Sequence, residues 1–269
     1  MHMKSEPPQL HARDYIASLA AAGHYHFTSG DAHEALGVSA DAAKLALNRL
    51  ARQTMIASPA RGFYVVVPPE YRSLRCLPAD QFIPALMERL GFHYYAGLLT
   101  AAQYHGAAHH RPQEFQVMLA KSRRPIRCGR VRVAFIVRKR LRDVAVQKFN
   151  TPRGSILVST PEATAIDLVG YHHHAGGLDQ VATILSELAE RIDPDKLASA
   201  AETAPISWAQ RLGFLLDHVG AGEKASALKL HVKNNAREAI PLLPGASRED
   251  AQRNADWKLF VNVDVEAES

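Results

Sequence analysis

The sequence predicts an α+β fold, and three observations along its 269 residues support that prediction. Residues 8–67 have apolar residues at helical spacing, and this segment ends in a hairpin pattern. Between residues 115 and 159 the apolar period changes from 3.6 to 2, which indicates short strands. Helical spacing then returns from residue 161 onward. We therefore expect helices, then a small and mostly antiparallel sheet, then further helices.

The N-terminal part has the pattern of three short helices. The first helix is expected at about 9–22. Thr28 or Ser29 is suited to cap a second helix, which should end before Gly37 because glycine commonly follows the last turn of a helix. A third helix is expected over 40–53, with Ser39 as its N-cap. Two short helices joined by a tight turn that contains glycine are typical of a helix-turn-helix.

A hairpin is predicted directly after the third helix. Residues 56–57 and 63–67 favour strands, and they flank a turn-rich loop at 58–62. Three helices followed by a hairpin predict a winged helix-turn-helix domain over residues 1–75. The rest of the chain, residues 76–269, is expected to form one larger α+β domain, and two domains agree with the length of the chain.

The third predicted helix presents polar side chains that are suited to DNA. Lys44, Asn48 and Arg52 recur every four residues along one face, and Arg49 lies beside them. Lys and Arg neutralise phosphates, while Asn and Arg make paired hydrogen bonds to base edges in the major groove. Arg61 adds a cation at the tip of the hairpin. We predict that these five residues bind DNA; the alternative is an ordinary amphipathic helix with a solvated face.

The elements of the second domain follow from the same periodicities. Four segments rich in β-branched residues are predicted to be strands, at 115–120, 130–137, 144–149 and 155–159. Helices are predicted at 79–90, 95–105, 161–171, 178–191, 194–203 and 206–219, and a closing strand at 257–263. From Val131 to Val137 every odd position is apolar, so one face should be buried. Arg130 and Arg132 should then lie together on the opposite face.

The positive charge of the chain is concentrated in one stretch. The whole chain has a net charge of +5, but residues 111–153 alone contain 13 basic and 2 acidic residues, and the C-terminal part is acidic. Five arginines of this stretch are candidates for a binding surface: Arg123, Arg124, Arg127, Arg130 and Arg132. Such a polarised charge distribution is typical of proteins that bind nucleic acid or an oppositely charged partner. The alternative is a solvated face of the sheet.

The sequence lacks the patterns that several common enzyme classes need. It has no phosphate-binding loop, dinucleotide fingerprint, nucleophile elbow or metalloprotease helix. Two groups of histidines, His105 with His109 and His110, and the run 172–174, are interpreted as surface or helix-end residues because neither has the spacing of a metal site. We therefore expect no catalytic residue, no metal and no cofactor, and we expect that the protein is not an enzyme.

The cysteines and the apolar runs indicate the compartment. Cys76 and Cys128 lie 52 positions apart, and an isolated pair of this kind fits a reducing compartment and excludes a disulfide scaffold or a structural zinc site. The N-terminus lacks the apolar segment of a secretory signal, and no apolar run approaches the roughly 18 residues of a membrane helix. We expect a soluble, cytoplasmic protein with no membrane partner.

Four motifs together resemble a known family. They are Gly62–Val66, Ser159–Val169, Arg211–Leu216 and Trp257–Asn262. With these motifs the chain is similar over nearly its whole length to the AbiEi antitoxins of bacterial abortive-infection, type IV toxin–antitoxin systems. The resemblance implies an N-terminal winged helix that binds inverted repeats in its own promoter and represses transcription. It also implies a C-terminal domain that counteracts a nucleotidyltransferase-like toxin encoded beside it. The motifs have a structural interpretation as well, such as close helix packing at Gly213.

The leading hypothesis is therefore a DNA-binding autorepressor that is also an antitoxin, with operator DNA and a toxin as its partners. One alternative is a stand-alone winged-helix regulator whose C-terminal domain senses a small ligand or mediates dimerisation. Another is a nuclease or nucleotidyltransferase that the winged helix guides to DNA. The five arginines of the basic stretch either extend the DNA contact or serve the antitoxin function. The sequence favours the antitoxin use, because a winged helix is already a complete DNA-docking unit and the family separates its two activities by domain.

Overall fold

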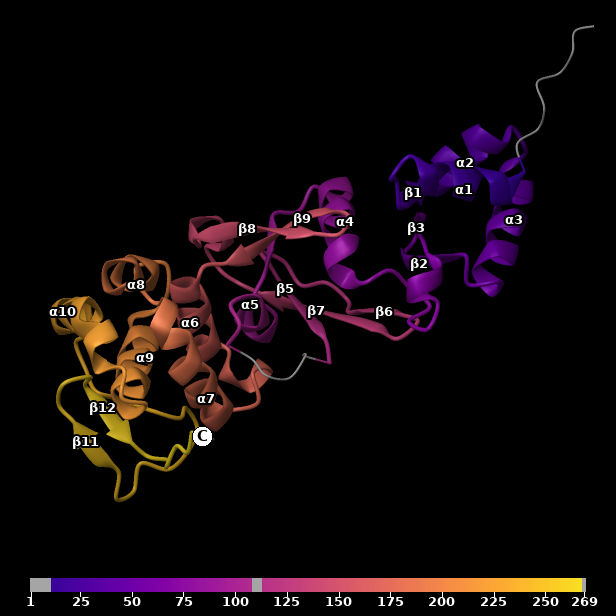
Figure 1. The fold of residues 1–269 in the computed structure, drawn as a ribbon. Coiled ribbons are helices and arrows are strands. Elements are labelled where there is room, and N and C mark those ends of the chain that lie inside the picture. Colours follow the sequence, from indigo (N-terminus) through magenta and orange to yellow (C-terminus); the bar gives the residue numbers. More distant parts are fainter. Residues whose placement is uncertain (1–10, 108–112, 268–269) are drawn as a thin grey trace, which may run out of the picture. The chain divides into compact units, whose positions relative to one another are not determined.

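The structure is a computed structural model that describes residues 11–107 and 113–267, and Figure 1 shows its helices and strands. Within these residues, helices occur together with three β-sheets, which confirms the predicted α+β class. The chain divides into two compact units. The first contains Met1–Phe92, Arg123–Phe135 and Asn150–Ile156, and the second contains His93–Ser122, Ile136–Phe149 and Leu157–Ser269. The boundary expected after residue 75 thus lies inside the first unit.

Three short helices begin the first unit: α1 (Ala12–Ala21), α2 (Ser29–Leu36) and α3 (Ala40–Arg52). The predicted caps are confirmed. The Thr28 hydroxyl accepts the N–H of Asp31 at 3.1 Å, and the Asp31 carboxylate accepts the N–H of Thr28 at 2.7 Å, which satisfies donors at the start of α2. Ser39 caps α3 by accepting the N–H of Ala42 at 3.3 Å. The predicted start of the first helix, at residue 9, lies outside the described residues.

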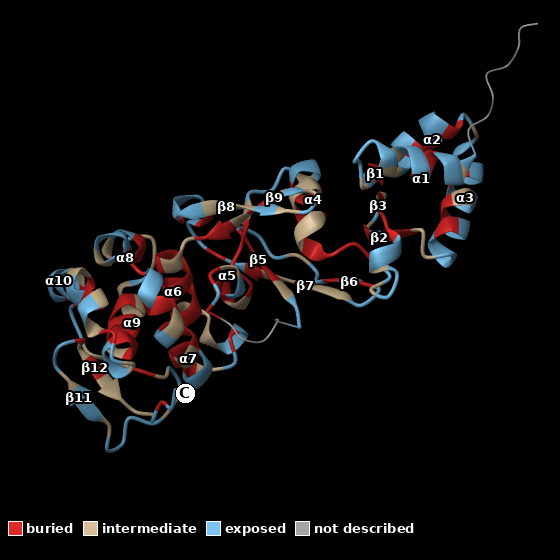
Figure 2. Cartoon of the chain, viewed as in Figure 1, coloured by how far each residue is buried: buried red, intermediate tan, exposed pale blue. Residues whose placement is uncertain are grey.

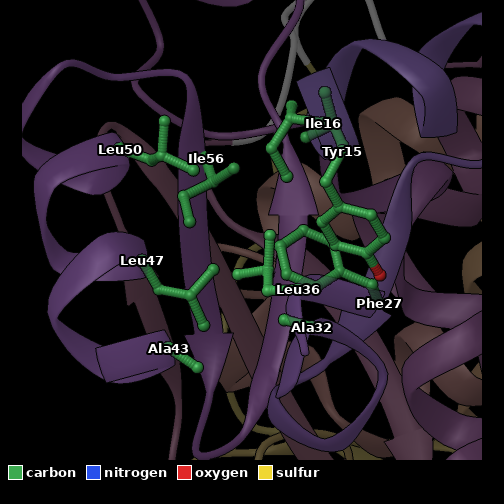
Figure 3. Close-up of a cluster of buried hydrophobic side chains, with 10 residues drawn as sticks. Tyr15, Ile16, Phe27, Ala32, Leu36, Ala43, Leu47, Leu50 and Ile56 are labelled. Carbon is green, nitrogen blue, oxygen red and sulfur yellow. The ribbon is translucent and has the colours of Figure 1, made fainter. Parts of the chain in front are cut away.

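A small sheet completes the N-terminal part of the first unit. Strands β2 (Ile56–Ala60) and β3 (Phe63–Val66) form the predicted hairpin, and β1 (His26–Thr28) pairs antiparallel with β3 on its other side. Strand β1 has only three residues, too few for a periodic pattern, so the sequence did not indicate it. The helices and the sheet share one apolar core, in which Figure 3 shows Tyr15, Ile16, Phe27, Ala32, Leu36, Ala43, Leu47, Leu50 and Ile56.

The first unit also contains segments that are distant in sequence. They are helix α4 (Ile83–Leu90), strand β6 (Ile126–Cys128), the first part of β7 (Val131–Val137), and the turn between β8 (Val146–Thr151) and β9 (Gly154–Ser159). In that turn, the Arg153 guanidinium lies 3.9 Å from the centroid of the Tyr25 ring and donates to the Glu70 carboxylate at 3.1 Å. These contacts attach the turn to the N-terminal part of the same unit.

The largest sheet has the strand order β6-β7-β5-β4-β9-β8, with β4 at Tyr94–Ala96 and β5 at Phe115–Leu119. Strand β4 is antiparallel to β5 and parallel to β9, and β6 is antiparallel to β7. The prediction of a helix over 95–105 is wrong in its first part, because β4 occupies these positions and α5 (Leu98–Tyr104) begins only after Gly97. Aromatic residues such as Tyr94 and Tyr95 favour strands, and a glycine weakens a helix interior.

Five longer helices belong to the second unit: α6 (Pro161–Gly170), α7 (Leu178–Leu188), α8 (Pro194–Ala201), α9 (Ile206–His218) and α10 (Ser226–Asn235). Helix α6 is central, because residues Glu162–Val169 are all buried and it packs against α5, α7, α8 and α9. The sequence missed α10, which buries only Leu228 and Val232. No helix in the described part of the chain has the length and apolar character to cross a membrane.

A second small sheet has the strand order β10-β12-β11, with β10 at Ile240–Pro241, β11 at Gln252–Asn254 and β12 at Leu259–Val261. The Trp257 side chain before β12 packs directly on Gly213 of α9, where any Cβ would overlap the indole ring. The indole N–H donates to the Asp217 carboxylate at 2.6 Å. Two of the sequence motifs are therefore packing partners, which confirms the predicted close packing at Gly213.

Candidate nucleic-acid interface

Helix α3 has one buried face and one exposed polar face. Its apolar residues Ala43, Leu47 and Leu50 are buried in the core of the first unit. Figure 2 shows that α3 carries both buried and exposed residues. The four predicted residues of this helix are all exposed: Lys44, Asn48, Arg49 and Arg52. Leu45, which the sequence analysis did not single out, is 59% exposed on the same helix. The structure thus brings the four predicted side chains together on a surface that the packing of α3 leaves free.

Arg61 lies with Gly62 in the turn that joins β2 to β3, and its side chain is exposed. The predicted loop at 58–62 is shorter than expected, because β2 continues to Ala60. Two side chains fix this turn. The Ser58 hydroxyl donates to the carbonyl oxygen of Ala60 at 3.0 Å, and Arg89 donates to the carbonyl oxygen of Gly62 at 2.7 Å. Arg61 is therefore an exposed cation on a turn of defined conformation.

The five arginines of the basic stretch lie on or beside the hairpin of β6 and β7, hereafter the arginine hairpin (residues 123–135). Arg127 and Arg132 are directly opposite each other across the two strands. Arg124, Arg127 and Arg130 are exposed and Arg132 is half-buried. Arg123 differs from these four, because its guanidinium lies 5.5 Å from the centroid of the Phe135 ring and its side chain is partly buried.

The predicted arrangement of Arg130 and Arg132 on one strand face is wrong. Arg130 lies before the start of β7, in the turn with Gly129, so the side chain across from Arg132 is that of Arg127. The predicted burial of the odd positions is wrong as well, because Val133 and Ile136 are buried while Val137 is 42% exposed. The reason is that the first part of β7 packs in the first unit and its last residues pack in the second, so no single face is buried throughout.

The arginine hairpin is packed firmly within the first unit. Its apolar side chains Ile126, Cys128 and Val133 are buried, and β6 packs against β2. The N–H of Arg130 donates to the carbonyl oxygen of Leu74 at 2.8 Å. The thiols of Cys76 and Cys128 share a hydrogen bond, which raises the pKa of Cys76. The segment that the sequence analysis assigned to the second domain is thus held by residues 74–76 and by β2.

The buried polar groups of the second unit have structural partners. The Asp167 carboxylate accepts from the Arg138 Nε at 2.8 Å and from the Tyr95 hydroxyl at 2.6 Å, and both Arg138 and Asp167 are buried. Burial raises the pKa of Asp167, and the ion pair with Arg138 opposes this rise. The sequence did not indicate this pair. Its only local signal was a carboxylate at Asp167 within the mostly apolar second half of helix α6.

The histidines also fit a structural interpretation where they can be assessed. The His105 ring is buried, with Nε2 at 2.8 Å from the carbonyl oxygen of Ser159. His109 and His110 lie outside the described residues. Residues 172–174 form one short turn of 3-10 helix. Within the described ranges 11–107 and 113–267, no group of three or more His, Cys, Asp or Glu residues is arranged to hold a metal ion.

Residues 95–218 match the family model of the AbiEi antitoxin C-terminal domain. Over these residues the chain is similar to the AbiEi antitoxins. The match confirms the resemblance for the part of the chain that contains the motifs Ser159–Val169 and Arg211–Leu216, and it indicates an antitoxin role in a toxin–antitoxin system. The AbiEi antitoxins are not a known enzyme family. The matched AbiEi segment includes the arginine hairpin, although the hairpin packs in the first unit.

A solved structure has the same fold over most of both chains. The crystal structure of the RV2827C protein from Mycobacterium tuberculosis superposes with a TM-score of 0.67 and covers 92% of this chain and 90% of its own. The two sequences are 18% identical, so the likeness concerns the fold. No curated protein sequence gives a significant match to the chain. The match to the AbiEi domain is therefore the comparison that bears on function, and the solved structure shows the fold alone.

Proposed function

We propose that the protein is an antitoxin that also represses its own transcription by binding operator DNA. In this proposal α1–α3 and β1–β3 are a winged helix, α3 is its recognition helix, and the turn at Arg61 is the tip of its wing. The observation that supports the proposal best is the exposed polar face of α3, where Lys44, Asn48, Arg49 and Arg52 lie opposite the buried apolar face.

The chemistry of this face matches the needs of a DNA interface. An α-helix fits the major groove, where asparagine can bind adenine through two hydrogen bonds and arginine can bind guanine in the same way. Lysine and arginine also release counterions when they bind phosphates, which supplies affinity for any sequence. We assign base contacts to Asn48 and to Arg49 or Arg52, and a phosphate contact to Lys44. Arg61 contacts a phosphate or the minor groove beside the helix.

The partner in the antitoxin role is a nucleotidyltransferase-like toxin encoded beside this gene, and the protein acts in the cytoplasm. The AbiEi domain at residues 95–218 supports an antitoxin role, and the identity of the toxin is the part that we add as a proposal. Co-expression with the adjacent gene tests the antitoxin part of the proposed function. Growth should be restored by the intact protein. Toxicity that persists in the presence of the protein would contradict the assignment.

Footprinting on the upstream promoter tests the DNA-binding half. The variant Lys44→Ala/Asn48→Ala/Arg52→Ala should lose protection of the promoter. A matched control is Lys233→Ala/Asn234→Ala/Arg237→Ala, which removes the same three residue types from exposed positions at the end of α10 and just beyond it. The control should protect the promoter as the natural protein does. Equal protection by both variants would mean that α3 is not the recognition helix.

Two single substitutions separate the roles within α3. Asn48→Ala should relax the base preference and cost about 1–3 kcal/mol at the contacted base pair. Lys44→Ala should instead weaken binding to all duplexes to a similar degree and flatten the dependence on salt. Binding to promoter and scrambled duplexes over a range of salt concentrations distinguishes the two patterns.

A further inference from the structure

Four arginines of the arginine hairpin form no ion pair with a carboxylate in the part of the chain that the structure describes. Among the residues that the structure describes, ion pairs with carboxylates involve Arg138, Arg140, Arg153 and Lys229, and none involves Arg124, Arg127, Arg130 or Arg132. Arg127 and Arg132 are paired directly across the strands, where like charges are unfavourable. A cluster of exposed cations that the fold does not neutralise is suited to an external polyanion.

The hairpin backbone gives these cations fixed positions. One face of β6 is buried through Ile126 and Cys128, so the alternation of the strand places Arg127 on the other face. The turn is held because the N–H of Arg130 donates to the Leu74 carbonyl oxygen, and Arg132 donates to the carbonyl oxygen of Gly129 at 3.0 Å. A cation on a rigid ribbon loses less conformational freedom when it binds than a cation on a mobile loop does.

The hairpin lies beside the proposed wing within the same unit. Strand β6 packs against β2, and the N–H of Ser58 in β2 donates to the Cys128 sulfur in β6. Ser58 is three residues before Arg61, the residue that we place at the tip of the wing. The arginine hairpin and the wing are therefore neighbouring hairpins of one compact unit.

The hairpin also supplies most of the positive charge of that unit. Residues 1–92 contain nine basic and eight acidic residues, so the N-terminal part has a net charge of only +1. Residues 123–135 contain five arginines and no acidic residue. Because counterion release scales with the number of phosphates that are neutralised, the N-terminal part alone is a weak source of affinity for DNA. The five arginines of the hairpin supply the positive charge that the N-terminal part lacks.

We propose that the arginine hairpin is a second DNA contact, which binds the phosphate backbone of the duplex that α3 reads. This inference rests on the proposed function, because it needs a duplex held by the first unit. Arg124, Arg127 and Arg130 bind phosphates and contribute affinity without sequence preference. The placement of the hairpin in the first unit is the reason that we prefer this use to the antitoxin use that the sequence favoured.

The salt dependence of binding to a random 30-base-pair duplex tests the proposal. The variant Arg124→Gln/Arg127→Gln/Arg130→Gln should bind at least about tenfold more weakly at 100 mM salt, and the slope of log K against log salt should decrease by roughly 0.9 for each lost phosphate contact. The corresponding Lys variant should keep most of the slope, because a lysine also neutralises a phosphate. The control Lys233→Gln/Arg237→Gln/Arg253→Gln removes the same charge from exposed positions of the second unit and should bind as the natural protein does.

The possible outcomes separate this inference from the proposed function. If the natural protein binds no duplex, both are overturned. If it binds, and the Gln variant of the hairpin retains the full slope with an unchanged melting temperature, only the inference is overturned. If that variant retains the slope but no longer neutralises the toxin in a growth assay, the hairpin serves the antitoxin function, which also overturns the inference. A reduced slope with intact neutralisation supports it.

Discussion

Arg132 and Arg138 are six positions apart in the sequence and have opposite environments. Arg132 lies in the first unit, half-buried, across from another arginine. Arg138 lies in the second unit with only 2% of its side chain exposed, and it is paired with Asp167. A single basic stretch therefore contains two kinds of arginine, one that builds a core and one that is available to a partner. Charge counted along the sequence cannot separate the two kinds.

The contacts of Arg138 show what a buried guanidinium requires. Its Nε donates to Asp167, one Nη donates to the carbonyl oxygen of Lys139 at 2.7 Å, and the other donates to the Thr203 hydroxyl at 3.2 Å. The Trp208 ring lies 5.1 Å from the guanidinium carbon. Every nitrogen has a partner, so the large cost of removing the cation from water is offset. The exposed arginines of the hairpin need no such partners.

Removing Arg138 should have the largest effect on stability. Arg138→Met leaves the Asp167 carboxylate buried without its cation, and we expect a loss of about 3–5 kcal/mol in the free energy of unfolding. Arg127→Met, on the exposed face of the arginine hairpin, should change it by no more than about 0.5 kcal/mol. Urea unfolding of both variants measures the difference. Similar losses in the two would contradict the division into buried and available arginines.

A double variant sharpens this test. Arg138→Met/Asp167→Leu removes both charges, so no ion is left buried alone, and the loss should be smaller than in Arg138→Met. If the double variant is less stable than the single one, the main contribution of this pair is its direct attraction, and the desolvation argument is wrong for this site.

The attachment of the arginine hairpin to the first unit should be broken by Gly129→Ala. Gly129 has φ of +56°, and a Cβ there would overlap the Leu74 carbonyl oxygen. We expect a loss of about 1–3 kcal/mol in stability. Gly37→Ala is a matched control, because Gly37 has φ of +62° but open space around it. Gly37→Ala should lower stability only through the strain of an alanine at positive φ. Equal losses in both variants would show that the overlap with Leu74 is unimportant.

Local features could be predicted from the sequence, and contacts between distant segments could not. The caps at Thr28 and Ser39 depend on residues three positions away, so the helices of the first unit and the exposed face of α3 followed from sequence alone. Asp167 and Arg138 are 29 positions apart, and nothing in either segment indicates the other. The error at Arg130 has a similar origin, because a turn held by Leu74 ended the strand where periodicity continued it.

Acid should weaken the second unit through His105. Its Nε2 must donate to the Ser159 carbonyl oxygen, and its Nδ1 lies 3.3 Å from the Gln147 amide nitrogen, so the ring is neutral when folded. Burial lowers the pKa of His105 below its usual 6.5. The contribution of His105 to the free energy of unfolding is complete above pH 6.5, the pKa of the unfolded chain. It is lost as the pH falls from there through the lower pKa of the folded protein, because the unfolded chain then binds a proton that the folded chain does not.

Urea unfolding between pH 8 and pH 5 checks this pH dependence. One proton contributes at most ~1.4 kcal/mol per pH unit, and we expect a total effect on the order of 1 kcal/mol. His105→Gln keeps a donor for Ser159 but cannot take up a proton, so the part of the acid effect that comes from His105 should be absent from it. An identical pH profile in the two proteins would show that His105 does not titrate in this range.

Arg61→Glu should have the smallest effect on stability and a clear effect on binding. Arg61 is exposed at the turn between β2 and β3, and the contacts that hold this turn come from Ser58 and Arg89, so the substitution removes no packing. We expect a change in stability below about 0.5 kcal/mol, measured by the melting temperature. The reversed charge should repel phosphates if Arg61 is at the tip of a wing on DNA, so affinity for a duplex should fall. Unchanged affinity would remove the wing tip from the interface and leave α3 and the arginine hairpin to bind DNA. A large loss of stability would mean instead that Arg61 supports the turn. An exposed arginine of the first unit would then contribute to packing, and exposure alone would not identify the arginines that are available to a partner.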